Sequence, residues 1–202
     1  MNNCIIINGQ KIELTPEQIE KAVAALSTVR VKLSEIPVAD TVRIGDHELV
    51  VLEQLDGATA LIRKDLYGEA MEFSSDNNYA DSYVDCACET FACEIAEAIG
   101  AENILDHTVD LTSDDGLKDY GTVERRASLL TTDRYRKYVE TLDKFSPDAW
   151  WWLATPYSTA THGNTSWVKC VSPSGIIGNL LYISDYGVRP FCILKSDIFV
   201  SR

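Results

Sequence analysis

Three consecutive tryptophans, Trp150 to Trp152, restrict the fold of this chain more than any other feature. They open the run "WWWLAT", and the fourth and last tryptophan, Trp167, opens a second β-rich run, "WVKCVS". Successive side chains of a strand point to opposite faces, so Trp150 and Trp152 would share one face while Trp151 lies on the other. We expect at least two of the three to be buried in the core, because side chains this large dominate core packing. They would then hold a rigid sheet beneath the loops that follow.

The surrounding sequence predicts an α+β domain over residues 38–202. Strand-like patterns fill residues 40–66, and the carboxy-terminal part adds "AWWWLAT", "SWVKCVS", "YISDYGVRPFCIL" and "DIFVS". Two main helices lie between them, one from about Tyr83 to Ile99 and one that begins at Thr131 or Thr132. This order favours helices packed on an antiparallel sheet. We expect the segments "WWWLAT", "WVKCVS" and "GVRPFCIL" to pair in a single sheet.

A smaller amino-terminal unit, residues 1–33, precedes this domain. "CIIINGQKIEL" contains two short β-rich runs around Asn8-Gly9, a dipeptide typical of two-residue hairpin turns. "LTPEQIEKAVAAL" then predicts a helix with Thr15 as its cap and Pro16 in its first turn. A unit this small needs a surface to pack on. We expect it to dock on the main domain or to assemble the chain into a homo-oligomer.

The charge of the chain restricts its partners. The sequence holds 18 basic and 31 acidic residues, a formal net charge of −13, and such a surface repels the phosphates of nucleic acids and of anionic membranes. No apolar run approaches the ~20 residues that cross a bilayer, and "MNNCIIINGQKIEL" does not resemble a signal peptide. We therefore expect a protein made in the cytoplasm, kept there or assembled into a virus particle, that binds neither nucleic acid nor membrane.

The cysteines do not form a recognisable metal motif. "DCACETFAC" places Cys86, Cys88 and Cys93 close together, but a zinc site needs a second ligand pair and the sequence offers none. We expect buried thiols instead, with Cys88 on the apolar stripe of the first helix. Cys170 and Cys192 lie on predicted strands, and a reducing compartment argues against a disulfide between them.

Catalytic motifs are also missing from the sequence. The three histidines are scattered, and no Gly-rich phosphate loop, GxSxG elbow or HExxH is present. Asp114, Asp115 and Asp119 lie in "DLTSDDGLKDYG", which lacks the alternating ligands and bidentate Glu of a calcium loop and favours a solvated acidic turn. We therefore expect no catalytic residues, no metal and no cofactor. A hydrolase that uses carboxylates of this acidic loop is the alternative.

Arg189, in "GVRP", is expected to have a structural role. An arginine followed by proline near the end of a core strand is held in place by its surroundings. Its guanidinium can bind backbone carbonyls or a carboxylate and so fix the last strand. Direct binding of a ligand is the alternative.

Several motifs in a fixed order resemble a known family. "LLTTDRY", "WWWLATP", "WVKCVSPSG" and "YGVRPFCIL", with "NNYADSYVDCACETF" upstream, resemble an uncharacterised bacterial and phage domain family. Its members share a Trp-Trp-Leu-Arg/Ala-Ser/Thr-Pro strand and a terminal Gly-Val-Arg-Pro motif, and the resemblance covers residues 38–202. The layout is similar to the C-type lectin-like fold, including its formylglycine-generating-enzyme branch, as an analogy of fold alone. Formylglycine-generating chemistry would need active-site cysteines in an arrangement that this chain does not match.

Proteins of this kind are often targets of diversity-generating retroelements, which rewrite adenine-containing codons near the 3′ end of a gene. The resemblance therefore implies a variable, ligand-binding surface within residues 157–186. The strings "WWLATP", "VKCVSPSG" and "GVRPFCIL" bracket two irregular patches there. An ordinary pair of loops is the alternative. The candidate ligand-binding residues are Tyr157, Thr165, Ser166 and Trp167 in the first patch, and Asn179, Leu180, Tyr182, Ser184, Asp185 and Tyr186 in the second.

This composition suits recognition whatever its origin. Tyr and Trp provide large contact areas at low entropic cost, while Ser and Asn provide adaptable hydrogen bonds. We expect a non-catalytic recognition protein of phage, prophage or gut-bacterial origin that binds a protein or a glycan through residues 157–186. The alternatives are the acidic-loop hydrolase and a structural virion or accessory protein that assembles through its amino-terminal unit.

Overall fold

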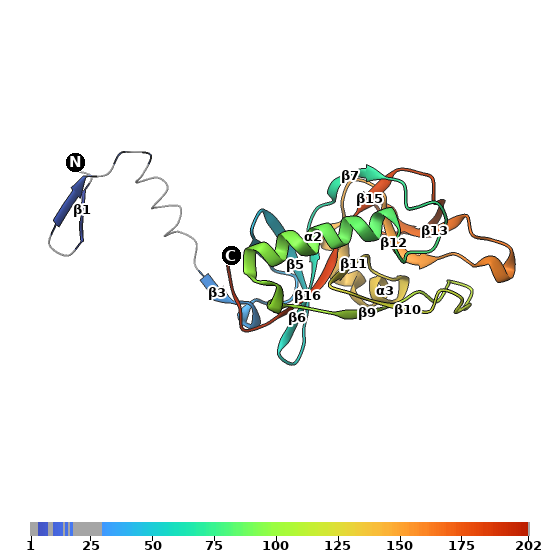
Figure 1. The fold of residues 1–202 in the computed structure, drawn as a ribbon, viewed down its shortest axis with the longest axis horizontal. Coiled ribbons are helices and arrows are strands. Elements are labelled where there is room, and N and C mark those ends of the chain that lie inside the picture. The colour runs from blue at the N-terminus through green and yellow to red at the C-terminus, as the bar shows by residue number, and fades with distance from the viewer. Residues whose placement is uncertain (1–3, 8–9, 14, 16, 18–29, 202) are drawn as a thin grey trace.

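The computed structural model describes residues 4–7, 10–13, 15, 17 and 30–201 (Figure 1). Within these residues the protein has a mixed α+β fold, made mostly of β-sheet with two α-helices, α2 (Tyr83–Ile99) and α3 (Thr132–Leu142). The predicted α+β class and the two predicted helices are thereby confirmed. None of the described helices is both long and apolar enough to span a membrane.

Two large sheets form the body, and nearly all of their strand pairs are antiparallel. The eight-stranded sheet has the order β11-β16-β6-β5-β4-β17-β3, with β8 also paired to β16. Its strands are β3 (Arg30–Lys32), β4 (Thr41–Ile44), β5 (His47–Gln54), β6 (Ala58–Arg63), β8 (Ile104–Leu105), β11 (Ala127–Ser128), β16 (Phe191–Lys195) and β17 (Phe199–Ser201).

The five-stranded sheet has the order β14-β13-β12-β15-β7 and contains the one parallel pair among the described strands, β12 with β15. Its strands are β7 (Tyr67–Met71), β12 (Trp151–Pro156), β13 (Trp167–Val171), β14 (Ile177–Leu181) and β15 (Tyr186–Val188). A separate two-stranded sheet joins β9 (His107–Asp110) to β10 (Thr122–Arg125). Short 3-10 turns are η1 (Leu33–Glu35), η2 (Ala101–Asn103), η3 (Asp143–Phe145) and η4 (Ala160–His162).

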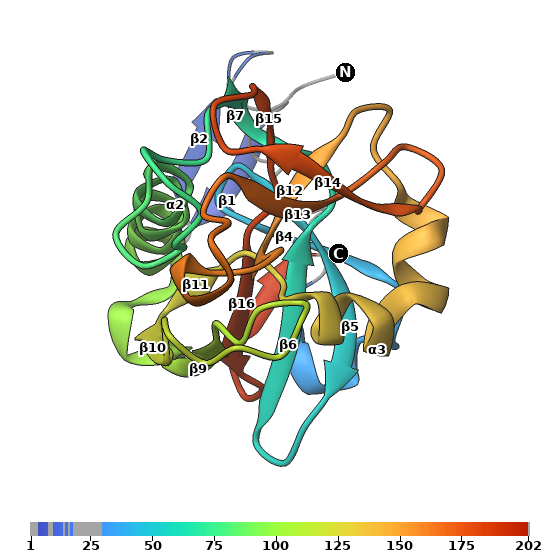
Figure 2. The ribbon, with the colours of Figure 1, turned by 90° about the vertical axis from the view of Figure 1, so that its right-hand side faces the viewer.

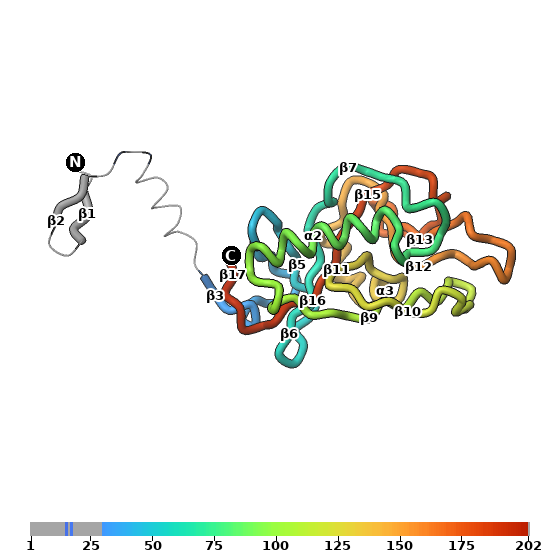
Figure 3. Tube along the Cα trace, viewed as in Figure 1, coloured from blue at the N-terminus to red at the C-terminus, as the bar shows by residue number. Residues whose placement is uncertain are grey.

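The amino-terminal segment contributes a hairpin and a strand of the large sheet. β1 (Cys4–Ile7) pairs antiparallel with β2 (Gln10–Glu13), and Ile7 lies opposite Gln10 as a two-residue connection requires. The helix predicted after Thr15 lies outside the described residues. Arg30–Lys32, at the end of the predicted amino-terminal unit of residues 1–33, pairs with β17 near the carboxy terminus (Figure 3). Since Leu33 is also fully buried, the body begins before residue 38.

Helix α2 begins and ends where its sequence signals predict. The Ser82 side chain caps it by accepting a hydrogen bond from the Asp85 amide, and Gly100 ends it with a φ of 90°. Its buried stripe, spaced at helical intervals, includes Val84, Cys88 and Phe91. This stripe joins a core that also contains side chains of β5 and β6 and the ring of Trp152.

Helix α3 covers a second core on the other side of β12. Thr131 caps it by accepting from the Arg134 amide. Tyr135, Tyr138 and Leu142 are its buried apolar side chains, and the Tyr135 ring lies 5.8 Å from that of Trp151. Figure 2 shows α2 and α3 on opposite sides of the body, with the sheets between them.

The adjacent tryptophans therefore belong to different cores. Trp151 packs in the α3 core and Trp152 in the α2 core, with exposed fractions of 1% and 0%. Trp150 is half-buried on the Trp152 side, where its ring is 6.4 Å from that of Tyr186. The prediction that at least two of the three are core residues is confirmed, and so is their division between the two strand faces.

The segment "GVRPFCIL" does not stay in one sheet, contrary to expectation. β12 and β13 pair as predicted, but β15 belongs to the five-stranded sheet and β16 to the eight-stranded sheet. The chain crosses between the sheets at Arg189-Pro190. Proline has no amide hydrogen to continue a ladder of strand hydrogen bonds, so the pairing can change partner there.

Arg189 occupies this crossing and is fully buried. Its guanidinium donates to the carbonyls of Arg63 (2.9 Å), Lys64 (3.0 Å) and Phe145 (2.8 Å). It also lies over the ring of Trp151, 5.2 Å from the centroid. Burial lowers the pKa of Arg189 to about 10, so the group stays charged at neutral pH. The predicted structural role is confirmed, with carbonyls rather than a carboxylate as acceptors.

Matched substitutions should separate the buried tryptophans from the exposed one. Trp151→Ala should lower the free energy of unfolding by about 3–5 kcal/mol, because it removes buried contacts and leaves a cavity. Trp167→Ala deletes the same side chain from a position that is 39% exposed, and should cost less than about 1 kcal/mol. Urea denaturation would measure both. Equal losses would show that the division between scaffold and surface is wrong.

A conservative change at the crossing should also destabilise the protein. Arg189→Lys keeps the charge, but an ammonium cannot reproduce the planar fork that reaches three carbonyls. We expect a loss of about 3 kcal/mol, since buried acceptors would be left unpaired. Arg43→Lys, at the exposed position of β4, is the control and should leave the urea midpoint unchanged. A midpoint for Arg189→Lys equal to that of wild type would contradict the role given to the guanidinium.

Candidate functional site

The structure brings the two predicted patches together at one end of the five-stranded sheet. The Tyr157 amide donates to the Trp167 carbonyl, and the Tyr182 amide donates to the Ser166 carbonyl, both at 3.0 Å. In the β13–β14 pair, Trp167 lies opposite Leu181. Residues 10 to 16 positions apart in sequence are therefore direct neighbours.

The second patch is not an irregular loop, contrary to expectation. Asn179 and Leu180 belong to β14 and Tyr186 to β15, so that only Tyr182, Ser184 and Asp185 lie in the connection between these strands. Leu180, Tyr182 and Tyr186 are half-buried against the α2 core, and the Tyr186 ring is 5.1 Å from that of Trp152. These three side chains support the sheet more than they present a surface.

Five side chains on or beside these strands make up what we call the aromatic face: the exposed Tyr157, Trp167, Asn179 and Leu181, and the almost fully buried Lys169. Trp167 and Lys169 are two positions apart on β13, so their side chains point to the same side of the sheet. Leu181 and Asn179 of β14 lie opposite them and point to that side too. The Lys169 ammonium lies 6.0 Å from the centroid of the Tyr157 ring, which places Tyr157 beside them. The exposed fractions are 40% for Tyr157, 39% for Trp167 and 37% for Leu181.

The remaining predicted residues lie beside the aromatic face. Thr165 and Ser166 precede β13 and are half-buried, and Ser184 and Asp185 lie in the β14–β15 connection, with Asp185 exposed. Lys169 and Leu181 were not predicted. The two-residue period of a strand could have identified both, because it places Lys169 on the same side as Trp167 and Leu181 on the same side as Asn179.

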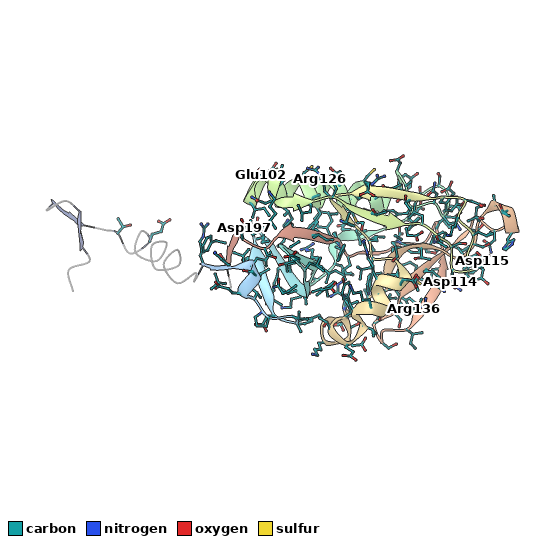
Figure 4. All side chains as sticks on the ribbon, turned by 90° about the horizontal axis from the view of Figure 1, so that it is seen from below. Glu102, Asp114, Asp115, Arg126, Arg136 and Asp197 are labelled. Atoms are coloured by element: carbon teal, nitrogen blue, oxygen red, sulfur yellow. The ribbon has the colours of Figure 1, made fainter. Side chains whose placement is uncertain are left out.

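Two ion pairs that share Asp114 link the aromatic face to helix α3. Lys169 is almost fully buried, and its ammonium is 3.1 Å from Asp114 Oδ2. Arg136 of α3 lies 4.0 Å from the other oxygen of Asp114. Figure 4 shows Asp114 and Asp115 close together, with Arg136 nearby. The face is therefore closed on this side by paired charges, while farther along the same strands α3 covers Val171 and Ile177.

The acidic loop holds the segment that follows β12. Asp115 accepts hydrogen bonds from Ser113 (2.5 Å), Ser158 (2.6 Å) and His162 (2.8 Å). Asp119 accepts from Thr159 (2.5 Å) and Thr161 (2.6 Å). The acidic turn is exposed, as expected, but its carboxylates also accept hydrogen bonds from a segment that is distant in sequence. The hydroxyl groups of Ser158, Thr159 and Thr161 are the donors from that segment.

These donors lower the pKa of both carboxyl groups. For Asp115 the main cause is the hydrogen bond from Ser113, followed by those from Ser158 and His162. For Asp119 the main cause is the hydrogen bond from Thr159, followed by that from Thr161. Both groups therefore stay ionised at neutral pH. Within the part of the chain that the structure describes, no cluster of His, Cys, Asp and Glu is arranged to hold a metal ion.

The three histidines lie in separate surroundings. His107 bonds Ser128 Oγ at 2.8 Å, and burial, with a smaller effect of Arg134, lowers its pKa to about 3. Burial also lowers the pKa of His47, which lies 3.1 Å from Glu94. His162 is the partner of Asp115. They do not converge on a common site.

The cysteines are only partly as predicted. Cys88 is buried on α2, but Cys86 and Cys93 are exposed, because they lie on the helix side turned away from the sheets. Cys170 and Cys192 are buried free thiols in different sheets. Burial raises the pKa of each of these two thiols to about 12, so neither is a ready nucleophile.

Removing the Asp115 charge should loosen the segment that borders the aromatic face. The amides of His162, Gly163 and Asn164 donate to carbonyls within this segment. Asp115→Asn replaces an acceptor oxygen with a donor, so these amides should exchange hydrogen roughly tenfold faster. Hydrogen-exchange mass spectrometry would measure the rates, with the exposed Asp106→Asn as control. Unchanged rates would show that Asp115 does not hold the segment.

The hydrogen bonds that Asp115 accepts should weaken only at low pH. Because the pKa of Asp115 is lower in the folded protein, its contribution is complete above the ordinary carboxyl pKa. That contribution is lost only as the pH falls through the lowered value. Protection of the segment in wild type should therefore persist to a pH below the usual range for carboxyl titration.

Comparison with known proteins gives one finding. The family described as "Domain of unknown function (DUF6273)" matches residues 56–196, which include β6 to β16 and both helices. No curated protein and no solved structure matches the chain. Because the match extends over more than half of the sequence, the chain belongs to the DUF6273 family.

Proposed function

We propose that this protein is a non-catalytic recognition protein that binds a protein or a glycan through the aromatic face. The observation that carries the proposal is the placement of exposed Trp167 and Leu181 opposite one another on a sheet, with the exposed Tyr157 beside them. The buried Trp151 and Trp152 hold that sheet from both faces. Exposed apolar groups that gather in one place mark interaction sites, whereas scattered ones need no explanation.

The chemistry of the aromatic face suits a macromolecular partner. Tyr157 and Trp167 are rigid, amphipathic side chains of the kind that dominate binding energy at interfaces. Asn179 adds an amide that donates and accepts, and Lys169 adds a charge already paired with Asp114. Because strands fix these groups in place, binding would order few side chains and lose little entropy.

The acidic loop supports recognition over hydrolysis. A carboxyl group that acts as a general acid needs a raised pKa. Asp115 and Asp119 have lowered values, since hydroxyl donors stabilise their charged forms. Their hydrogen bonds instead fix the segment beside Tyr157, which is a positioning role for a binding surface.

We also propose that the body is a C-type lectin-like fold of phage or prophage origin whose residues 157–186 are diversified by a retroelement. The support is the motif order in the sequence and the meeting of the two patches on one sheet. The DNA beside the gene is the test. A reverse-transcriptase gene and a near-copy of the 3′ segment that differs at adenines are expected, and their absence would argue against diversification.

Matched alanine variants would test the binding surface. Wild-type protein is screened on a glycan array and on arrayed bacterial surface proteins, and the Kd of each hit is measured. Tyr157→Ala and Trp167→Ala should each weaken binding at least about tenfold, because anchors at an interface centre carry most of its energy. Tyr182 and Tyr186 are unsuitable test positions, since they pack against the core.

The control is Phe199→Ala on β17, an exposed aromatic residue of the other large sheet. It should bind as wild type does, and circular dichroism should show that all three variants are folded. Full affinity in folded Trp167→Ala and Tyr157→Ala, or equal loss in Phe199→Ala, would exclude the aromatic face as the site.

A further inference from the structure

The end strands of the two large sheets differ in how they are protected from pairing with another chain. Natural proteins protect such edges with charged side chains or with very short strands. β3 carries the exposed Arg30 and Lys32, and β7 carries the exposed Glu69. β11 has only two residues. These three edges are protected in the usual ways.

β14, the fourth end strand, has no such protection. Its sequence is "IGNLL", and no charged residue occurs from Cys170 to Ser184. The strand and its flanks also expose large apolar side chains, with exposed fractions of 65% for Ile176, 37% for Leu181 and 56% for Ile183. An uncharged edge of this length favours the addition of another strand.

The backbone of β14 directs its free groups outward. The Trp167 carbonyl accepts from Tyr157, so the polar backbone groups of Trp167 point toward β12 and away from β14. Trp167 and Leu181 are therefore a non-hydrogen-bonded pair of the β13–β14 ladder. Such pairs recur at every second residue of an antiparallel ladder, so Lys169 with Asn179 and Val171 with Ile177 are also non-hydrogen-bonded pairs. The amides and carbonyls of Ile177 and Asn179, and the Leu181 amide, thus face the open edge, while the Leu181 carbonyl accepts from Ser184.

We propose that two copies of this protein pair through β14, antiparallel about a two-fold axis at Asn179. In this register Asn179 exchanges both backbone hydrogen bonds with the partner's Asn179. The Leu181 amide donates to the carbonyl of the partner's Ile177, and symmetry repeats the bond. Ile177 and the partner's Leu181 are then opposite one another, which matches apolar with apolar side chains. A register shifted by one residue at the axis would instead place Ile177 opposite Asn179.

A second copy suits this edge better than a charged partner strand. Each copy has a formal net charge of −13, so close approach is least unfavourable where both surfaces are uncharged. The asparagine amide is its own complement, since it donates and accepts. Pairing uses the backbone edge and, of the aromatic face, the side chains of Asn179 and Leu181. It leaves Tyr157 and Trp167 free, so the proposal does not depend on the proposed function.

A charge-swap experiment tests both the edge and the register. Asn179→Lys and Asn179→Glu place like charges directly opposite one another in a homodimer. Sedimentation velocity of the full chain over a concentration series should show a dimer for wild type and for Asn179→Ala. The Lys and Glu variants should each dimerise about tenfold more weakly. An equimolar mixture of the two should recover the wild-type dimer.

The control is Thr122→Lys, which adds the same charge to an exposed position of β10 and should not affect the dimer. Circular dichroism should show that every variant is folded. A wild-type protein that stays monomeric at its highest soluble concentration would overturn the proposal. Dimerisation that the charged variants leave unchanged would place the interface elsewhere, and a mixture that does not recover would exclude the register centred on Asn179.

Discussion

The contact of Arg189 with Trp151 and three carbonyls is the interaction on which the two-sheet body depends. The guanidinium takes its acceptors from the last residue of β6, from the residue that follows it and from the end of η3, and it covers the indole that α3 packs against. A buried charge without partners would be very costly, but here the carbonyls and the aromatic ring satisfy it. The same occupation removes Arg189 from any role in ligand binding. As its sequence context predicts, Arg189 has a structural role, at the point where the chain passes from one sheet to the other.

Around this joint, β12 separates two cores that are built on adjacent tryptophans. Trp152 packs toward α2 and Trp151 toward α3, so neither face of the strand can shift without opening a cavity. This rigidity extends along β13 and β14 to the aromatic face, where Trp167 and Leu181 emerge beyond the reach of α3. The burial of Trp151 and the exposure of Trp167 on the next strand are thus two results of where α3 lies.

Much of this architecture could be predicted from local signals, and the rest required contacts distant in sequence. Ser82, Gly100 and Thr131 mark helix ends by chemistry that acts within one turn. The tryptophan triplet predicted a strand buried on both faces through the period of two. In contrast, the sequence "GNLLYISDYG" predicts an irregular patch, because turn-forming residues at both of its ends obscure β14. No local signal could show that Arg189-Pro190 changes sheets, that Asp115 meets Ser158, or that Arg30–Lys32 pairs with the carboxy-terminal strand.

The aromatic face and the free edge of β14 occur in the same hairpin because one structural fact produces both. α3 covers Val171 and Ile177 and leaves the Trp167–Leu181 end of the strands open, and no described strand pairs beyond β14. The edge pairs mainly through backbone amides and carbonyls in the plane of the sheet, whereas Tyr157 and Trp167 project from the face. Pairing at the edge would extend the sheet and place two aromatic faces on one continuous surface. A partner with repeated epitopes would then be bound at both faces, and its avidity would exceed the affinity of either face without any new contact.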